Sequence, residues 1–188
     1  MTESRPRSYR LTPSNDFADP RIAAFDAALD ESAARLTDLV VDLGDDQIRH
    51  APEPANISIA QLIKHIVWAE CNWVHRLTAV EIPEDLAERC SGASAEELAG
   101  ADAGDITSDE LVTLIRDGRN RYAHIALSNL ENVDRSIGAK QRPATVREVL
   151  VHLIWHWTYH TGQVGLLRDF VGAEYTWRFE ENDSGGET

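Results

Sequence analysis

The hydrophobic residues of this chain recur every three or four positions through four long stretches, as they do in helices that have one apolar face. The stretches run from about Pro20 to Leu43, Ser58 to Val80, Thr107 to Leu130 and Thr145 to Gly172. Segments rich in Gly, Pro, Ser and acidic residues separate them. Strand-like alternation is nearly absent, so the pattern predicts an all-α protein, a four-helix bundle.

Boundary signals agree with these four stretches. Three of them begin with a capping box, in which a hydroxyl residue is followed three positions later by Gln or Glu. The pairs are Ser58 with Gln61, Thr107 with Glu110, and Thr145 with Glu148. Asp19 before Pro20 forms a cap and first turn for the first stretch, which Gly44 ends. Pro83 follows the second stretch and Gly172 ends the fourth.

With 188 residues, the chain is expected to form one domain. The bundle is predicted to cover residues 20–178, with an N-terminal extension at 1–19 and a flexible acidic tail at 179–188. A loop from Pro83 to Asp105 is rich in Ala, Glu and Asp, and a short helix is expected within it at Ala93 to Ala99. The composition of this loop selects no ligand.

The formal net charge is -14, from 32 acidic and 18 basic side chains. Such a chain repels a phosphate backbone, so we expect no nucleic acid partner. No apolar run is long enough to span a membrane and the N-terminus has no apolar signal-peptide core, so a cytoplasmic protein is expected. Cys71 and Cys90 have neither CxxC spacing nor a disulfide framework.

Candidate chemistry is concentrated in the fourth stretch, where His152, His156 and His160 follow one another at four-residue intervals. Four residues turn a helix by about 40° beyond a full turn, so adjacent members share one face. Two imidazoles in this arrangement can bind one metal ion. A catalytic site needs a third protein ligand and an open position, and the third ligand must come from another helix.

His65 is the best-placed third ligand, because Leu62, Ile66 and Leu77 put it beside the stripe that faces the core. The other candidates are His50, His75, His124 and His152. The alternative for each histidine is an ordinary packed or hydrogen-bonded side chain, and for His152 a position one turn outside the site. The residues alone leave this choice open.

Two segments resemble the signatures of one family, the DinB-like or YfiT-like superfamily of four-helix metalloproteins. LIKHIVWAECNWV, from Leu62 to Val74, is similar to its second-helix motif, with Glu70 and Trp73 as the acidic and aromatic members. HLIWHWTYHTGQVGLLRD, from His152 to Asp169, is similar to its fourth-helix motif. With the four predicted helices, the resemblance extends over roughly residues 20 to 172.

The resemblance implies a divalent metal ion, with zinc the first expectation and nickel the second, bound by His65, His156 and His160. Many relatives have Glu at the position of His156 and His at that of Gln163, which leaves the preferred metal open. Gln163 is expected to hydrogen-bond a metal-bound water or a group that supports a ligand. Glu70 is a candidate fourth ligand, but it lies about 140° around the helix from His65, which favours a structural role.

Enzymes of this superfamily typically transfer or isomerise with the help of a small thiol such as mycothiol or bacillithiol. The resemblance therefore implies a metal-dependent transferase that adds a low-molecular-weight thiol to an electrophilic small molecule. Two alternatives stay open: a metal-dependent hydrolase, and a non-enzymatic metal-binding stress-response protein. The related mycothiol-dependent maleylpyruvate isomerase has a further C-terminal domain that is not seen here, so that reaction is not expected.

The resemblance also implies a homodimer, because members of the superfamily often pair their bundles. No part of the sequence identifies the surface that such a pair would use.

Overall fold

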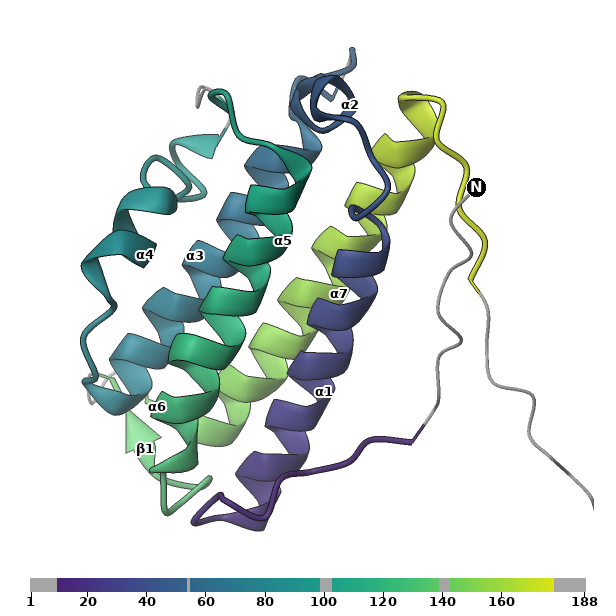
Figure 1. The fold of residues 1–188 in the computed structure, drawn as a ribbon. Coiled ribbons are helices and arrows are strands. Elements are labelled where there is room, and N and C mark those ends of the chain that lie inside the picture. Colours follow the sequence, from purple (N-terminus) through teal and green to yellow (C-terminus); the bar gives the residue numbers. More distant parts are fainter. Residues whose placement is uncertain (1–9, 54, 99–102, 139–142, 178–188) are drawn as a thin grey trace, which may run out of the picture.

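Four helical runs lie side by side in the computed structural model, which describes residues 10–53, 55–98, 103–138 and 143–177 (Figure 1). Three runs are single helices: α1 (Pro20–Asp38), α3 (Ile59–Thr78) and α7 (Val146–Phe170). The remaining run is continuous but has three parts: α5 (Ser108–Arg116), the π-helical segment η2 (Asp117–Ala123) and α6 (His124–Ser128). The expected all-α four-helix bundle is confirmed.

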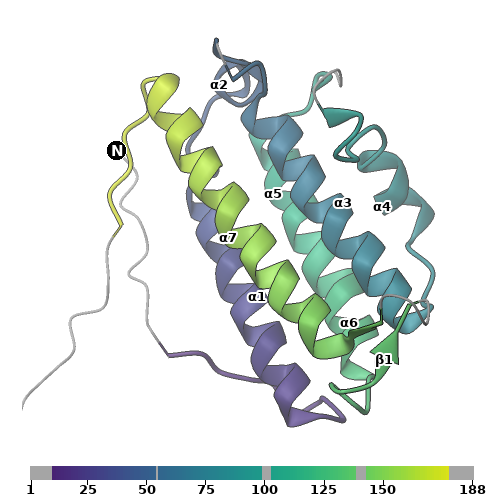
Figure 2. The same ribbon diagram turned by 180° about the vertical axis from the view of Figure 1, so that it is seen from behind.

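α7 packs between α1 and α3 along much of its length (Figures 1 and 2). The α5–η2–α6 run closes the opposite side, where it contacts both α1 and α3. The buried side chains of all four runs meet in one hydrophobic core. Among the described residues, no helix has the length and apolar character needed to cross a bilayer.

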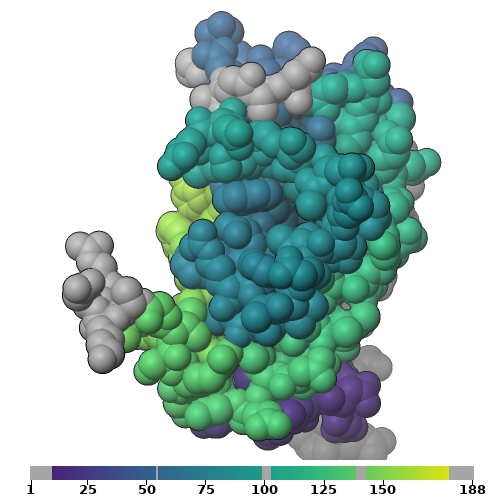
Figure 3. All heavy atoms as spheres, turned by 90° about the vertical axis from the view of Figure 1, so that its left-hand side faces the viewer, coloured from purple at the N-terminus to yellow at the C-terminus, as the bar shows by residue number. Residues whose placement is uncertain are grey.

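Short elements connect the long helices. α2 (Asp45–Arg49) precedes α3, and α4 (Glu84–Arg89) follows it. Figure 3 shows α4 and the segment after it lying over the outer side of α3. Before α7, β1 (Ser136–Ile137) pairs antiparallel with β2 (Ala144–Thr145).

All three predicted capping boxes are present. In each, the hydroxyl at the N-cap accepts the backbone N–H three residues on, and the Gln or Glu at that position accepts the N-cap N–H. Asp19 caps α1. Its carboxylate also accepts a hydrogen bond from the backbone N–H of Val133, in the loop between α6 and β1.

α1 ends at Asp38, five residues before the predicted end at Leu43. The physical reason is Arg168 of α7, whose buried guanidinium donates to the carbonyl of Leu39 at 2.8 Å and pairs with Asp42. These contacts satisfy a carbonyl at the helix end and hold the following turn. Leu43 stays buried although it is not helical.

The loop after α3 differs from its prediction. Its α-helix is α4, at Glu84–Arg89. Where a short helix was expected at Ala93 to Ala99, residues 94–97 form a bend and a turn, Leu98 is in a 3₁₀ conformation, and Ala99 lies outside the described residues. Two side chains of α3 form hydrogen bonds to backbone carbonyls of this segment. His65 bonds to the carbonyl of Ala93, and Gln61 donates to that of Leu98. The predicted tail at 179–188 and residues 1–9 of the predicted extension also lie outside the described residues.

The π-helical segment allows the third run to approach α3 closely. A Cβ atom on Gly118 would lie 2.6 Å from Cγ1 of Val67, a distance that no side chain tolerates. Glycine is therefore required here. The next residue, Arg119, enters the core, where its side chain is only 2% exposed.

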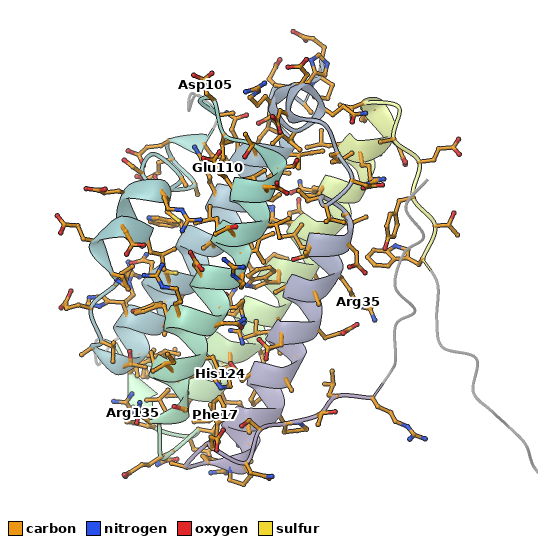
Figure 4. The ribbon with its side chains drawn as sticks, viewed as in Figure 1. Phe17, Arg35, Asp105, Glu110, His124 and Arg135 are labelled. Atoms are coloured by element: carbon orange, nitrogen blue, oxygen red, sulfur yellow. The ribbon has the colours of Figure 1, made fainter. Side chains whose placement is uncertain are left out.

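Arg119 pairs with three carboxylates from two helices. It lies 2.6 Å from both Asp26 and Asp30 of α1, and it also donates to Glu70 of α3. Burial opposes the charge of Arg119, but the three carboxylates outweigh it and raise its pKa. His124 faces Asp26 at 2.7 Å and packs on the ring of Phe17 at the same end of the bundle (Figure 4). This network ties α1, α3 and η2 together.

Removing the cation from this network should destabilise the fold. Arg119→Met leaves Asp26 and Glu70 buried without their counter-ion, and the expected loss in unfolding free energy is about 3–5 kcal/mol. Arg121→Met is the matched control, because Arg121 pairs with Asp85 at the surface and its loss should leave stability nearly unchanged. Urea denaturation followed by circular dichroism measures both, and equal stability of the two variants would contradict the assignment.

Candidate metal centre

The structure brings together the three histidines that the resemblance selected. His65 comes from α3, and His156 and His160 come from successive turns of α7. One ring nitrogen from each lies within 4.8 Å of the others. His65 is buried, while His156 and His160 are half-buried. Nε2 of His65 and Nε2 of His156 face each other at 3.2 Å.

A backbone carbonyl sets the orientation and tautomer of His65. Nδ1 of His65 lies 2.8 Å from the carbonyl oxygen of Ala93, and since a carbonyl can only accept, Nδ1 carries the hydrogen. The lone pair is then on Nε2, the nitrogen that faces His156. This is the usual way in which a protein prepares a histidine to bind a metal ion.

Gln163 does the same for His160. Its Oε1 accepts from Nδ1 of His160 at 2.6 Å, and its Nε2 donates to the hydroxyl of Tyr159 at 3.4 Å. The second contact orients the amide so that the oxygen faces the imidazole. Nε2 of His160 is therefore the nitrogen with the free lone pair. The contact made by Gln163 is to the candidate ligand itself, one turn earlier on α7.

His156 is held neutral by its surroundings. Burial, reinforced by the neighbouring His160, His65 and His152, lowers its pKa to about 3. Burial also lowers the pKa of His160, against the opposing hydrogen bond to Gln163. A neutral imidazole is the form that binds a metal ion.

Both the distances and the donor types fit a divalent metal ion. Two nitrogens bound tetrahedrally at about 2.0–2.1 Å from zinc lie roughly 3.3 Å apart, close to the 3.2 Å between His65 and His156. Nδ1 of His156 is buried with no hydrogen-bond partner among the described residues. The close approach of the ring nitrogens fits a shared divalent cation.

Aromatic rings surround the three histidines. The ring of Trp68 is stacked 6.3 Å from His65, and the ring of Tyr159 lies edge-on at 5.0 Å from His160. Trp155 stacks on Tyr159 at 5.5 Å. These rings form an apolar wall on two sides of the site, Trp68 beside His65 and Tyr159 with Trp155 beside His160.

The remaining histidines lie elsewhere or play other parts. His152 is exposed and packs against Trp73 at 5.8 Å, one turn outside the cluster. His75 binds the carbonyl of Val80, His124 faces Asp26, and His50 ends α2. Glu70 points to Arg119 and not to the three histidines, in keeping with the structural role favoured from its position on the helix.

A second group, Asp26, Asp30 and His124, also brings possible ligand atoms within 4.8 Å. Arg119 already occupies and neutralises it, so it is not a metal site. Sequence reasoning missed the carbonyl of Ala93, for which no side-chain pattern exists. It also missed Arg119, for which the preceding Gly118 inside a helical stretch was the available signal.

The lowered pKa of His156 predicts how the stability of metal-free protein depends on pH. Below about pH 6.5 the unfolded chain protonates this histidine while the folded protein does not until about pH 3, so stability falls as the pH decreases through this window. In His156→Leu, the slope of unfolding free energy against pH should decrease by the contribution of about one bound proton. Urea denaturation of chelator-treated protein near pH 7.5 and pH 5 tests it, with His75→Leu as control. Identical slopes for wild type and His156→Leu would exclude it.

Comparison with known proteins agrees with the fold and names the family. The chain is similar to YfiT from Bacillus subtilis, described as "a probable metal-dependent hydrolase with an unusual four-helix bundle topology". The TM-score is 0.57 with 16% sequence identity, over 87% of this chain and 94% of that one. At 16% sequence identity, this similarity is evidence for the fold alone. No curated protein matches the sequence.

The family model of the mycothiol S-transferases matches residues 24–172, which include α1 from Ala24 onward, the other three helical runs and the three clustered histidines. The match covers most of the chain. This protein therefore belongs to the mycothiol S-transferase family, within the DinB-like and YfiT-like superfamily.

Proposed function

We propose that this protein is a metal-dependent transferase that joins a low-molecular-weight thiol, mycothiol or a close analogue, to an electrophilic small molecule. The metal ion is held by His65, His156 and His160. The observation that carries this proposal is the cluster of three imidazoles whose ring nitrogens converge, two of them, His65 and His160, held by hydrogen bonds to their outward Nδ1 atoms. Membership of the mycothiol S-transferase family supports the choice of thiol and reaction.

Zinc is the proposed ion and nickel the second choice, because three imidazoles suit either. When bound, the ion favours a thiolate over a thiol and so supplies a nucleophile at neutral pH. Three neutral ligands leave its positive charge uncompensated. The acidic surface of the chain, with a net charge of -14, attracts cations toward the protein.

The chain's own groups prepare the site before any ligand arrives. Ala93 and Gln163 hold two imidazoles in one tautomer, so these rings need no reorganisation on binding. Trp68 and Tyr159 wall the site with apolar surface. This wall lowers the local dielectric and strengthens every charge interaction inside it.

The proposed reaction forms one carbon–sulfur bond. The thiol gives up its proton to solvent, its sulfur attacks the electrophilic carbon, and the bond from that carbon to the leaving group breaks, with the leaving group taking the bonding electron pair. The apolar wall limits competition from water. Thiol and electrophile are thus the proposed partners, and which electrophile is used is a matter for screening.

A metal-dependent hydrolase is the second candidate function. It is favoured by the likeness to YfiT, which is described in those terms, and by a site whose three ligands leave room for a water molecule. In that case an ester or amide would be cleaved with no thiol present.

We also propose that the protein forms a homodimer. The cytoplasmic location and the lack of a nucleic acid partner stay predictions from the sequence.

The activity test uses purified protein with mycothiol and an aryl halide such as chlorodinitrobenzene, followed by absorbance of the conjugate. We expect thiol-dependent conjugation above the spontaneous rate, abolished by chelator, restored by zinc, and reduced at least about 100-fold in His156→Ala. His75→Ala is the matched control, since its side chain binds only the carbonyl of Val80. Ester cleavage without thiol would favour the hydrolase, and neither activity in zinc-loaded protein would contradict both functions.

A further inference from the structure

The outer face of α7 carries a stripe of exposed hydrophobic side chains, which we call the α7 stripe. Of the ten large hydrophobic side chains that are exposed in the described part of the chain, five belong to it. Its members are Val151, Trp155, Tyr159, Leu166 and Phe170, each 51–60% exposed. At 100° per residue they fall within about 100° of the helix circumference. An apolar stripe of this width on a helix ordinarily packs against another element.

No described element covers this stripe. Figure 2 shows α7 along the front of the bundle, with α1 and α3 behind and beside it and no helix in front. The neighbouring faces of α7 are already used. Leu153, Trp157 and Val164 enter the core, and His156 and His160 face α3.

Gly162 lies in the middle of the stripe, where α7 borders a groove that is also lined by Arg35 of α1 and by Trp177. A Cβ atom at this position would meet no described atom of neighbouring elements within 4 Å, and its backbone is ordinary helix. Glycine weakens a helix interior relative to alanine, and the described neighbours leave room for a side chain here. A glycine at the centre of an exposed apolar stripe permits another helix to approach closely.

The spacing of four of the five members is symmetric about Gly162 and Gln163, and only Val151 has no counterpart. Trp155 and Phe170 lie equally far from this midpoint along the helix, and so do Tyr159 and Leu166. Under a two-fold axis through the midpoint, an antiparallel copy of α7 places Trp155 against Phe170 and Tyr159 against Leu166. The same surface is then complementary to itself, as a two-fold interface requires.

We propose that the α7 stripe is the surface through which two copies of this chain pair, with their α7 helices antiparallel and crossing at Gly162. Side chains of the stripe expose on the order of 600 Å² per protomer, which together with flanking residues approaches the roughly 800 Å² per partner of a stable interface. The symmetric spacing favours a second copy over an unrelated helix.

This pairing completes the surroundings of the candidate metal centre. Tyr159 touches both Trp155 and His160, so the stripe borders the three clustered histidines directly. In the pair, Leu166 and Phe170 of the second copy cover the exposed sides of these two rings. The apolar wall of each site is thus built from both copies.

The test is sedimentation velocity of full-length protein from about 1 to 100 µM, a range that spans moderate dimer affinities. We expect a dimer in the wild type and at least tenfold weaker pairing in Leu166→Lys. Gly162→Leu should also separate the pair, although its side chain meets open space in the protomer. Ile125→Lys is the matched control, a 55% exposed position on α6, and should still dimerise. Circular dichroism checks that each variant is folded.

The register is tested by a cross-link. Gly162→Cys lies next to the proposed axis, where two Cα atoms come within disulfide range, and should form a covalent dimer on oxidation with diamide. Ile125→Cys should not. A wild type that stays monomeric over the whole range, a dimer unaffected by both Leu166→Lys and Gly162→Leu, or equal cross-linking of the two cysteine variants would overturn the proposal. None of these outcomes depends on catalytic activity.

Discussion

The position of α7 between α1 and α3 is the constraint on which the rest of this molecule depends. Because the helix has neighbours on two sides, each part of its circumference has a different environment. Trp157 faces the core and is fully buried, whereas His156, one residue earlier, faces α3 and meets His65. The four-residue interval to His160 keeps both histidines on that side. The same geometry leaves the α7 stripe on the outside.

Two polar clusters flank α3, and they solve the problem of burial in opposite ways. On one side the single guanidinium of Arg119 is shared by Glu70 and the carboxylates of α1, and burial raises the pKa of Glu70. On the other side three imidazoles converge, and burial lowers the pKa of His156 and of His160. An uncharged cluster of converging nitrogens favours a cation, whereas a compensated ion network does not. Only the side with His65, His156 and His160 is a candidate for chemistry.

Much of this arrangement was predictable from the sequence, because it rests on local rules. The capping boxes located three helix starts, and the spacing of His156 and His160 placed them on one face. The choice of His65 among the other histidines came from its apolar neighbours and from the resemblance, and the structure brings it to the other two.

Other features depend on contacts between distant segments and left no local pattern. The hydrogen bond from His65 to Ala93 joins a helix to a turn whose backbone supplies the acceptor. The early end of α1 depends on Arg168, more than a hundred residues later. The close approach of Gly118 in η2 to Val67 of α3 is another contact between distant segments, which a periodic pattern of apolar residues cannot reveal.

The most direct test of this account is the metal content of untagged protein by elemental analysis, comparing wild type, His160→Ala and His75→Ala. The account predicts about one zinc or nickel ion per chain in the wild type and in His75→Ala, and little in His160→Ala. Absence of metal from all three, even after incubation with zinc, would contradict it. The three histidines would then be packing residues of a bundle with no metal centre.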